Sequence, residues 1–224
     1  LIAAIFALSL AGNMPIWEPL LIYAFGTLWY GVFNWFWFWL WREQPLRESL
    51  SLLYRELADY CEAKYSLLTQ HTDPSTALPP LLTRQQKVVD LITQCYQQMH
   101  MLAANQRNDH KRLLRAFQMG LDLQEHISVS LHQPEEVQKL VERSHAEEVI
   151  RWNAQTVAAR LRVLADDILY HRLPTRFTME KQIGALEKIA RQHPDNPVGQ
   201  FCYWHFSRIA RVLRTQKPLY ARDL

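Results

Sequence analysis

The chain has 224 residues, a formal net charge of +3 and 49% hydrophobic residues, enough for one sizeable domain or for a membrane segment with a smaller domain. The small net charge argues against a strongly basic nucleic-acid-binding protein, and the hydrophobic content excludes a disordered chain. Three cysteines without a Cys-x-x-Cys pair, and six scattered glycines, exclude a disulfide framework, an ordinary zinc site and a glycine-rich nucleotide-binding loop.

The first 41 residues are apolar and almost uncharged. All 25 basic residues follow Trp41, and Glu18 is the only acid before it. Residues 20–41 form an uncharged run that, as a helix rising about 1.5 Å per residue, spans a hydrocarbon core of about 30 Å. The alternative, a buried core helix of a soluble protein, needs more surrounding mass than this chain offers. The run therefore predicts a transmembrane helix.

A second membrane segment is predicted before this run. Residues 1–12 are apolar but too short to cross a bilayer alone, and they lack the initiator methionine and basic start of a signal peptide. We interpret them as the end of a longer span in a chain that is a fragment, joined to the full span by a tight turn at residues 13–19. Arg42 and Arg47 follow this transmembrane hairpin, so the positive-inside rule predicts that residues 42–224 are cytoplasmic.

Polar side chains share one face of the predicted span. Tyr23, Thr27, Tyr30 and Asn34 step by four, three and four residues, which places them along one side of a helix. Polar groups at membrane depth usually face protein or a pathway. Two interpretations stay open: the face is a packing seam against other helices, where tyrosine and threonine are common, or it lines a path for a substrate.

Residues 42–224 have helical periodicity throughout and no convincing alternation of period two. The first helix is predicted to begin near Pro45, and residues 71–80 are predicted to form a loop. A second apolar stripe follows and ends where residues 105–109 break it. A third helix is predicted over residues 113–131. The first stripe contains Leu46, Leu50, Leu53, Leu57 and Cys61, and the second contains Val88, Ile92, Cys95, Met99 and Leu102.

Three more helices are predicted towards the C-terminus. Pro134 followed by two acids opens the fourth, which continues to about residue 172 with a bend near Ser144. The fifth follows Pro174. Asn196 as cap and Pro197 as first residue open the sixth, which runs to about residue 214. We expect Leu161 and Leu164 of the fourth helix to be buried, with Val88, Ile92 and Met99.

This pattern predicts an all-α protein, with a transmembrane hairpin over residues 1–41 and a cytoplasmic bundle of about six helices over residues 42–224. Stripes at three-four spacing are typical of antiparallel bundles. They also suit a dimeric coiled coil, but loops of roughly five to ten residues favour folding back on the same chain. The coiled-coil alternative would make the protein a homo-oligomer.

Residues that bind metals or catalyse reactions are sparse in the sequence. Glu142 and His145 have the Glu-x-x-His spacing of di-iron bundles, but no second copy accompanies them, so a solvated pair on a helix face is favoured. Asp167 and His171 suit a surface hydrogen bond. We therefore predict no metal and no cofactor.

His205 lies on an apolar stripe and is interpreted as a satisfied core histidine. The three cysteines also lie on apolar faces and are interpreted as small buried hydrophobic residues in a reducing compartment. No Gly-x-Ser-x-Gly motif is present. We predict no catalytic residue, and hence a protein that is not an enzyme.

The end of the chain is basic, with Asp223 as its only acid. A solvated helix face is the first interpretation, and a segment near the membrane that is attracted to anionic lipid is the second. The basic residues are Arg208, Arg211, Arg214, Lys217 and Arg222.

A family resemblance covers essentially the whole chain. It is carried by the strings NWFWFWLWREQPLRESLSLLYRELADYCEAKYSLL, SHAEEVIRWNAQTVAARLRVLADDILY and PVGQFCYWHFSRIARVLRTQKPLY. They resemble the FUSC family of bacterial inner-membrane proteins, in its YccS/YhfK branch. The resemblance implies two halves, each with membrane helices and a cytoplasmic helical domain, so this chain would hold the end of the first membrane set and the first domain.

The same resemblance implies export of small organic acids, aromatic ones among them. It also implies the lipid bilayer and the remaining membrane helices as partners, and no nucleic acid. On that basis Asn34 would donate a hydrogen bond to a carboxylate, and Trp29 or Tyr30 would contact an aromatic ring, with Tyr23 and Thr27 continuing the path. The alternative is a membrane-anchored interaction or assembly module without transport activity.

Overall fold

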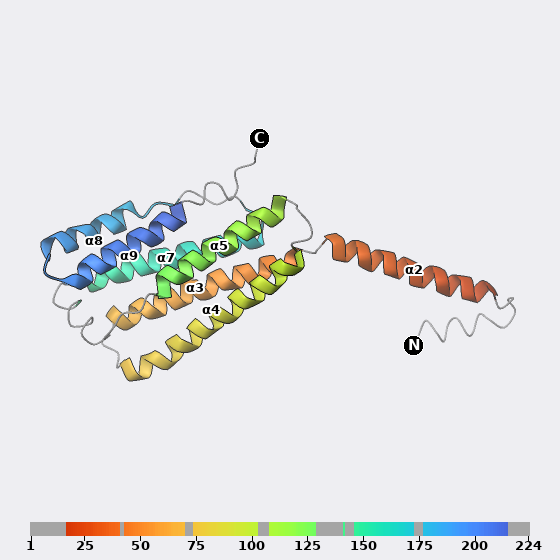
Figure 1. Ribbon diagram of the computed structural model, residues 1–224, viewed down its shortest axis with the longest axis horizontal. Coiled ribbons are helices and arrows are strands. Elements are labelled where there is room, and N and C mark those ends of the chain that lie inside the picture. The colour runs from red at the N-terminus through yellow and green to blue at the C-terminus, as the bar shows by residue number, and fades with distance from the viewer. Residues whose placement is uncertain are drawn as a thin grey trace. The chain divides into compact units, whose positions relative to one another are not determined.

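Figure 1 presents the computed structural model of the chain. It divides into two compact units, Leu1–Gln44 and Pro45–Leu224, and each is described by itself. The structure describes residues 17–40, 43–69, 74–102, 108–128, 141, 146–172 and 177–214. Within these ranges the ordered elements are α-helices, and no strand is found.

The first unit contains helix α2, Trp17–Leu40. The helix begins three residues before the predicted span, because Pro19 falls in its first turn, where a missing N–H leaves no hydrogen bond unmade. The side chains of residues 21–37 are all exposed. Among the described helices, none combines the length and the apolarity needed to cross a membrane. The predicted transmembrane hairpin is therefore not confirmed, and its first segment lies outside the described residues.

The second unit is a helical bundle. Its described helices are α3 (Gln44–Thr69), α4 (Pro74–Leu102), α5 (Asn108–Ser128), α7 (Glu147–Leu169), α8 (Glu180–Gln192) and α9 (Pro197–Arg214). The all-α prediction is confirmed for this part of the chain. The helices form because their apolar residues recur every three or four positions, so that each helix buries one stripe against its neighbours.

The start of α9 matches the predicted cap. The Asn196 side-chain oxygen accepts a hydrogen bond from the backbone N–H of Val198 at 3.0 Å, and Pro197 is the first helical residue. A side-chain cap followed by proline satisfies one N–H that the helix leaves unpaired and removes another.

The predicted loop over residues 71–80 is wrong from Pro74 onwards, because α4 begins at Pro74 and contains Pro79 and Pro80. Prolines near the start of a helix remove only the backbone bonds that would reach the first carbonyls, so the helix tolerates them better there than in its middle. The Thr83 hydroxyl donates to the carbonyl of Pro79 at 3.0 Å, one turn back. The pair of prolines therefore lies inside the helix.

The C-terminal end of α7 is closed by a residue in the left-handed region. His171 has a φ of 55°, and the backbone N–H of Arg172 donates to the carbonyl of Asp167 at 3.0 Å. This six-to-one bond is the mark of a Schellman ending. α7 therefore ends close to residue 172, where the fourth helix was predicted to end. The predicted start of that helix at Pro134 and its bend near Ser144 lie outside the described residues.

Helix α3 supplies much of the core of the bundle. Its apolar stripe, including Leu46, Leu50, Leu53 and Leu57, is fully buried. The Tyr54 hydroxyl donates to the carbonyl of Ala116 on α5 at 2.8 Å, so this buried phenol is paired across two helices.

The predicted core is confirmed at Val88, Leu161 and Leu164, which are all buried. Ile92 and Met99 are only partly buried. In Figure 1, α4 lies along one edge of the described helices, which agrees with the partial burial of its stripe.

Arg162 of α7 holds two carboxylates of α3. Its guanidinium donates to Glu62 at 3.0 and 2.7 Å and to Asp59 at 2.7 Å. Arg84 of α4 reaches the other oxygen of Asp59 at 3.3 Å. The network joins three helices, but its side chains are partly exposed, so solvent screening makes its contribution to stability small.

We expect residues 45–216 to fold without the rest of the chain, because the bundle has its own contiguous core. The purified segment should give a helical circular dichroism spectrum without appreciable sheet, and it should unfold cooperatively in urea. A strand-rich spectrum, or a segment that is unfolded in buffer, would contradict this expectation.

Candidate functional site

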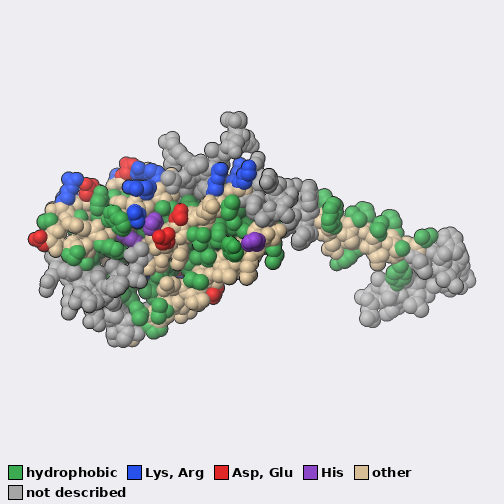
Figure 2. Space-filling model, in the orientation of Figure 1, with side chains coloured by type: hydrophobic (Ala, Val, Ile, Leu, Met, Phe, Trp, Pro, Cys, Tyr) green, Lys and Arg blue, Asp and Glu red, His purple; other side chains and the backbone are tan. Residues whose placement is uncertain are grey.

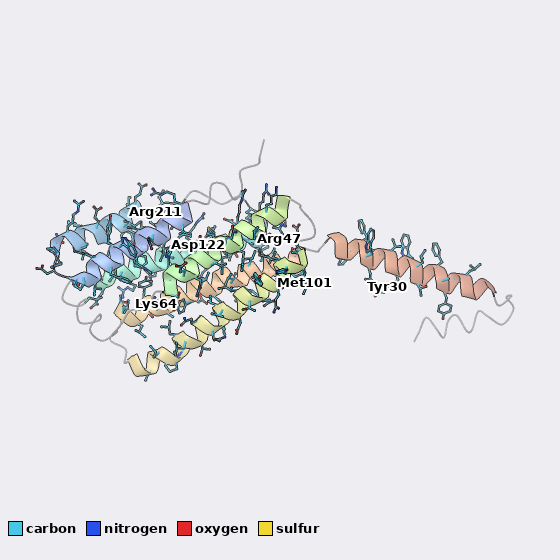
Figure 3. All side chains as sticks on the ribbon, in the orientation of Figure 1. Tyr30, Arg47, Lys64, Met101, Asp122 and Arg211 are labelled. Carbon is cyan, nitrogen blue, oxygen red and sulfur yellow. The ribbon has the colours of Figure 1, made fainter. Side chains whose placement is uncertain are left out.

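The polar face predicted on the first unit is present on α2. Tyr23, Thr27, Tyr30 and Asn34 all lie in this one helix with their side chains exposed. Because α2 is continuous through these positions, their four-three-four spacing places them on one side of it. Figure 3 labels Tyr30, whose side chain projects away from the helix axis.

The groups on this face differ in how their polar atoms are paired. The Thr27 hydroxyl lies 2.9 Å from the carbonyl of Tyr23 and 3.0 Å from that of Ala24, and it donates its proton back to its own helix. The side-chain amide of Asn34 has no hydrogen-bond partner within the described part of the chain. Asn34 is thus a donor that an outside group can use, and the exposed phenols of Tyr23 and Tyr30 are two more on this face.

Trp29 does not share the polar face. It follows Leu28 and precedes Tyr30, so it is rotated by about 100° from Tyr30 around the helix. It is exposed, as are Phe33 and Trp37, whose rings stack with centroids 5.9 Å apart. The predicted substrate contacts therefore form a polar face with a neighbouring aromatic surface.

The possible metal-binding pairs gain no support. Within the described ranges, no group of three or more His, Cys, Asp and Glu side chains is arranged to hold a metal ion. Glu142 and His145 lie outside those ranges. Asp167 and His171 were expected to form a hydrogen bond at the surface. This is wrong for Asp167, because it lies on the inner side of α7 and is only 6% exposed. Burial raises the pKa of this carboxyl, whereas Arg160 and Arg172 oppose that rise.

A buried lysine was missed by the sequence analysis. Lys64 continues the apolar stripe of α3 one turn beyond Cys61, and this position was the signal for its burial. Its ammonium donates to the carbonyl of Ile127 at the C-terminal end of α5. Such carbonyls have no partner within their own helix and carry partial negative charge, so a cation is favoured there.

Burial determines the protonation of the groups around Lys64. It lowers the pKa of Lys64 to about 8, and the neighbouring thiols partly oppose this. It raises the pKa values of Cys61 and Cys202 to about 12, so both thiols stay protonated and are poor nucleophiles. Burial, with Lys64 and His126, lowers the pKa of His205 to about 4.

The three cysteines and His205 are buried, as the sequence predicted. His205 is not fully satisfied, however, because its Nε2 has no hydrogen-bond partner among the described residues. Its ring stacks on Phe201 at a centroid distance of 5.3 Å and lies 6.1 Å from that of Tyr65. The region around Lys64, Cys61, Cys202 and His205 is therefore part of the packed core rather than a site with an activated group.

The chain belongs to the family described as FUSC-like inner membrane protein yccS, which matches residues 1–222. Membership confirms the resemblance and indicates an inner-membrane location. Over its full 224 residues the chain is 91% identical to the Uncharacterized protein YhfK of Escherichia coli (strain K12). It spans 32% of the length of that relative. No solved structure matches the chain.

Proposed function

We propose that the chain is part of an inner-membrane transporter that exports small organic acids, aromatic ones among them. The observation that carries the proposal is membership of a FUSC-like inner-membrane family over residues 1–222. The polar face of α2 supports it, since a helix beside a pathway needs groups that can bind a solute. The helical bundle would be the cytoplasmic domain of this transporter.

The membrane role of α2 rests on its charge and its exposed surface. From Leu20 to Leu40 it has no charged side chain, and the residues between 21 and 37 are exposed. Its mean hydropathy is lowered by tryptophan and tyrosine, whose ring N–H and O–H groups count as polar. Both residues are nevertheless favoured where a membrane meets water. We infer that α2 spans the bilayer, as the second arm of a hairpin.

The polar face suits an anionic solute for two reasons. It carries no negative charge, so it does not repel a carboxylate, and Asn34 offers an amide N–H. In a medium that excludes water, a hydrogen bond from an amide to a charged group is worth more than it is in water. The aromatic surface beside it, with Trp29, suits a ring.

A second function is a membrane-anchored interaction or assembly module. The partly uncovered edge of α4 favours it, because exposed apolar side chains lie there, among them Leu82, Val89 and Tyr96. A second copy or another subunit would cover that edge. In this case the polar face of α2 would be a packing seam between helices.

The orientation of the bundle gives one prediction. All Lys and Arg residues follow the proposed span, so residues 42–224 should be cytoplasmic. A cysteine introduced at the exposed Gln97 of the full-length protein should not react with a membrane-impermeant maleimide in cells with a permeable outer membrane. It should react once the inner membrane is opened. The parent protein is the control, since Cys61, Cys95 and Cys202 are buried. Reaction in cells whose inner membrane is intact would show that the bundle lies on the opposite side of that membrane.

The transport proposal predicts the effect of Asn34→Leu in the full-length protein. The variant should keep its expression and membrane insertion, yet the apparent affinity for exported benzoate should fall by about tenfold. A hydrogen bond to a charged group contributes about 1.5–3 kcal/mol, which corresponds to at least that factor. Efflux of radiolabelled benzoate from loaded cells measures it.

The matched control is Val32→Leu, which changes an exposed side chain on the side of α2 that lies away from the polar face. Unchanged efflux in Asn34→Leu would remove Asn34 from the path. Loss of expression in Asn34→Leu alone would instead assign the polar face to helix packing. If the unaltered protein exports no benzoate and no other aromatic acid, the transport proposal itself fails.

A further inference from the structure

The outward side of α9 is a basic surface without acids. Its exposed residues step by three or four positions along the helix, so they lie on one face, and α9 contains no Asp or Glu. We call this surface the α9 basic face. Its members are Gln200, Trp204, Arg208, Arg211 and Arg214.

Trp204 gives this face an amphipathic character. It is 53% exposed, and the guanidinium of Arg208 lies 4.1 Å from the centroid of its ring. The stacking holds a flat apolar ring beside a fixed positive charge. An exposed indole next to cations is typical of helices that lie at the boundary between lipid headgroups and acyl chains.

Helix α8 extends the positive surface. It forms a hairpin with α9, and the two helices approach closely where Gly199 lies against Ala190. Its exposed basic residues Lys181, Lys188 and Arg191 recur at steps of seven and three, along one side of α8. Figure 2 shows Lys and Arg side chains gathered over this part of the bundle.

Three acids of the hairpin, Glu180, Glu187 and Asp195, only partly offset this charge. Glu180 pairs with Arg214 at 3.3 Å, and Glu187 pairs with Arg191 on α8. Among the described residues of the hairpin, six exposed basic side chains therefore stand against three acids, so the surface keeps an excess of positive charge. An anionic partner is therefore complementary to it.

We propose that the α9 basic face, with the outer side of α8, docks on the anionic phospholipids of the inner membrane. The partner follows from charge complementarity and from membership of an inner-membrane family, which places a negatively charged bilayer next to the domain. Arg208 and Arg211 bind lipid phosphates, and Trp204 inserts at headgroup depth. The inference rests on the membrane location of the chain and is independent of any transported substrate.

The test uses the 224-residue chain in lipid nanodiscs, with a single cysteine introduced at Gln200 on the basic face. Nanodiscs of phosphatidylcholine are compared with nanodiscs in which about one third of the lipid is phosphatidylglycerol. We expect anionic lipid to slow maleimide labelling at position 200 by about fivefold, and salt at about 0.5 M to restore it. A cysteine at Gln97 on α4 is the control position and should react equally in both.

Matched charge variants distinguish protection by this surface from an effect of the net charge of the chain. Arg208→Gln with Arg211→Gln should abolish the protection of position 200, whereas Lys87→Gln with Lys111→Gln removes as much charge elsewhere and should leave it intact. Circular dichroism verifies that both variants are folded. Equal labelling of position 200 in the two kinds of nanodisc would overturn the proposal. Protection by added duplex DNA and not by anionic lipid would overturn it as well.

The same experiment distinguishes a failure of α2 to span the membrane from a failure of docking. If the chain does not remain with the nanodiscs, α2 is not a span. Docking is then measured from the protection of position 200 when vesicles of the same two compositions are added to the chain. Protection by the anionic vesicles alone would support docking even then, and its absence would overturn it.

Discussion

Replacing Leu161 with alanine should lower the free energy of unfolding of the bundle by about 2–5 kcal/mol. Leu161 lies in the middle of α7 and is fully buried, at 0% exposure. The substitution removes three buried carbon atoms, and it leaves a cavity that the surrounding helices fill only in part. Both effects act in the same direction, which is why the expected loss is a large share of the stability of a domain this size.

The matched control is Leu52→Ala on α3, because Leu52 is 51% exposed and the chemical change is the same. Its effect should stay within about 0.5 kcal/mol. Urea unfolding of residues 45–216, followed by circular dichroism, measures both variants. Similar losses for the two variants, or a loss near zero for Leu161→Ala, would mean that the inner face of α7 has been assigned incorrectly.

Stability should also fall as the pH drops from 6.5 towards 4, because of His205. Burial and two nearby basic groups, Lys64 and His126, lower its pKa to about 4 in the folded state, against an ordinary value of 6.5. Between these values the unfolded chain binds a proton that the folded chain does not, so stability rises with pH across this window and is lost on acidification. At 1.36 kcal/mol for each tenfold change in the proton equilibrium, the loss is roughly 3 kcal/mol.

The variant His205→Phe isolates this effect. Phenylalanine keeps a flat ring against Phe201 and Phe206 but cannot bind a proton. Its free energy of unfolding should therefore fall less than that of the parent between pH 7 and pH 4.5. The control is His193→Phe, since His193 is exposed, and it should follow the parent. If His205→Phe also follows the parent, the buried imidazole is not the group that titrates.

The sequence predicted helices well because their signals are local. An apolar stripe, a cap and a first-turn proline all lie within a few residues of one another, as at Asn196 and Pro197, where the predicted cap is confirmed. The error at residues 71–80 has the same origin. Pro79 and Pro80 together normally indicate a loop, and they outweighed Asp73 and Pro74, which repeat the pattern of a cap residue followed by a first-turn proline.

The polar face of α2 was likewise visible from spacing alone, since four residues on one helix keep their angular relation in any fold. The basic residues of α9 were also recognised, but only as a charged segment at the end of the chain. Trp204 and Arg208 are four residues apart on α9, so their contact is local to that helix. That the outer side of α8 continues the surface required the packed hairpin.

The sequence by itself determined the helical class, the main apolar stripes, the burial of the cysteines and the family. Only the tertiary structure decided which polar residues enter the core and which stripe stays partly uncovered. Lys64 is buried because it meets the carbonyl of Ile127, 63 residues away, and Ile92 is half-buried on α4, which lies at the edge of the described helices. The physical reason is the sequence distance over which each interaction acts. Periodicity determines locally which side of a helix is apolar, whereas burial depends on which helix, distant in the sequence, covers that side.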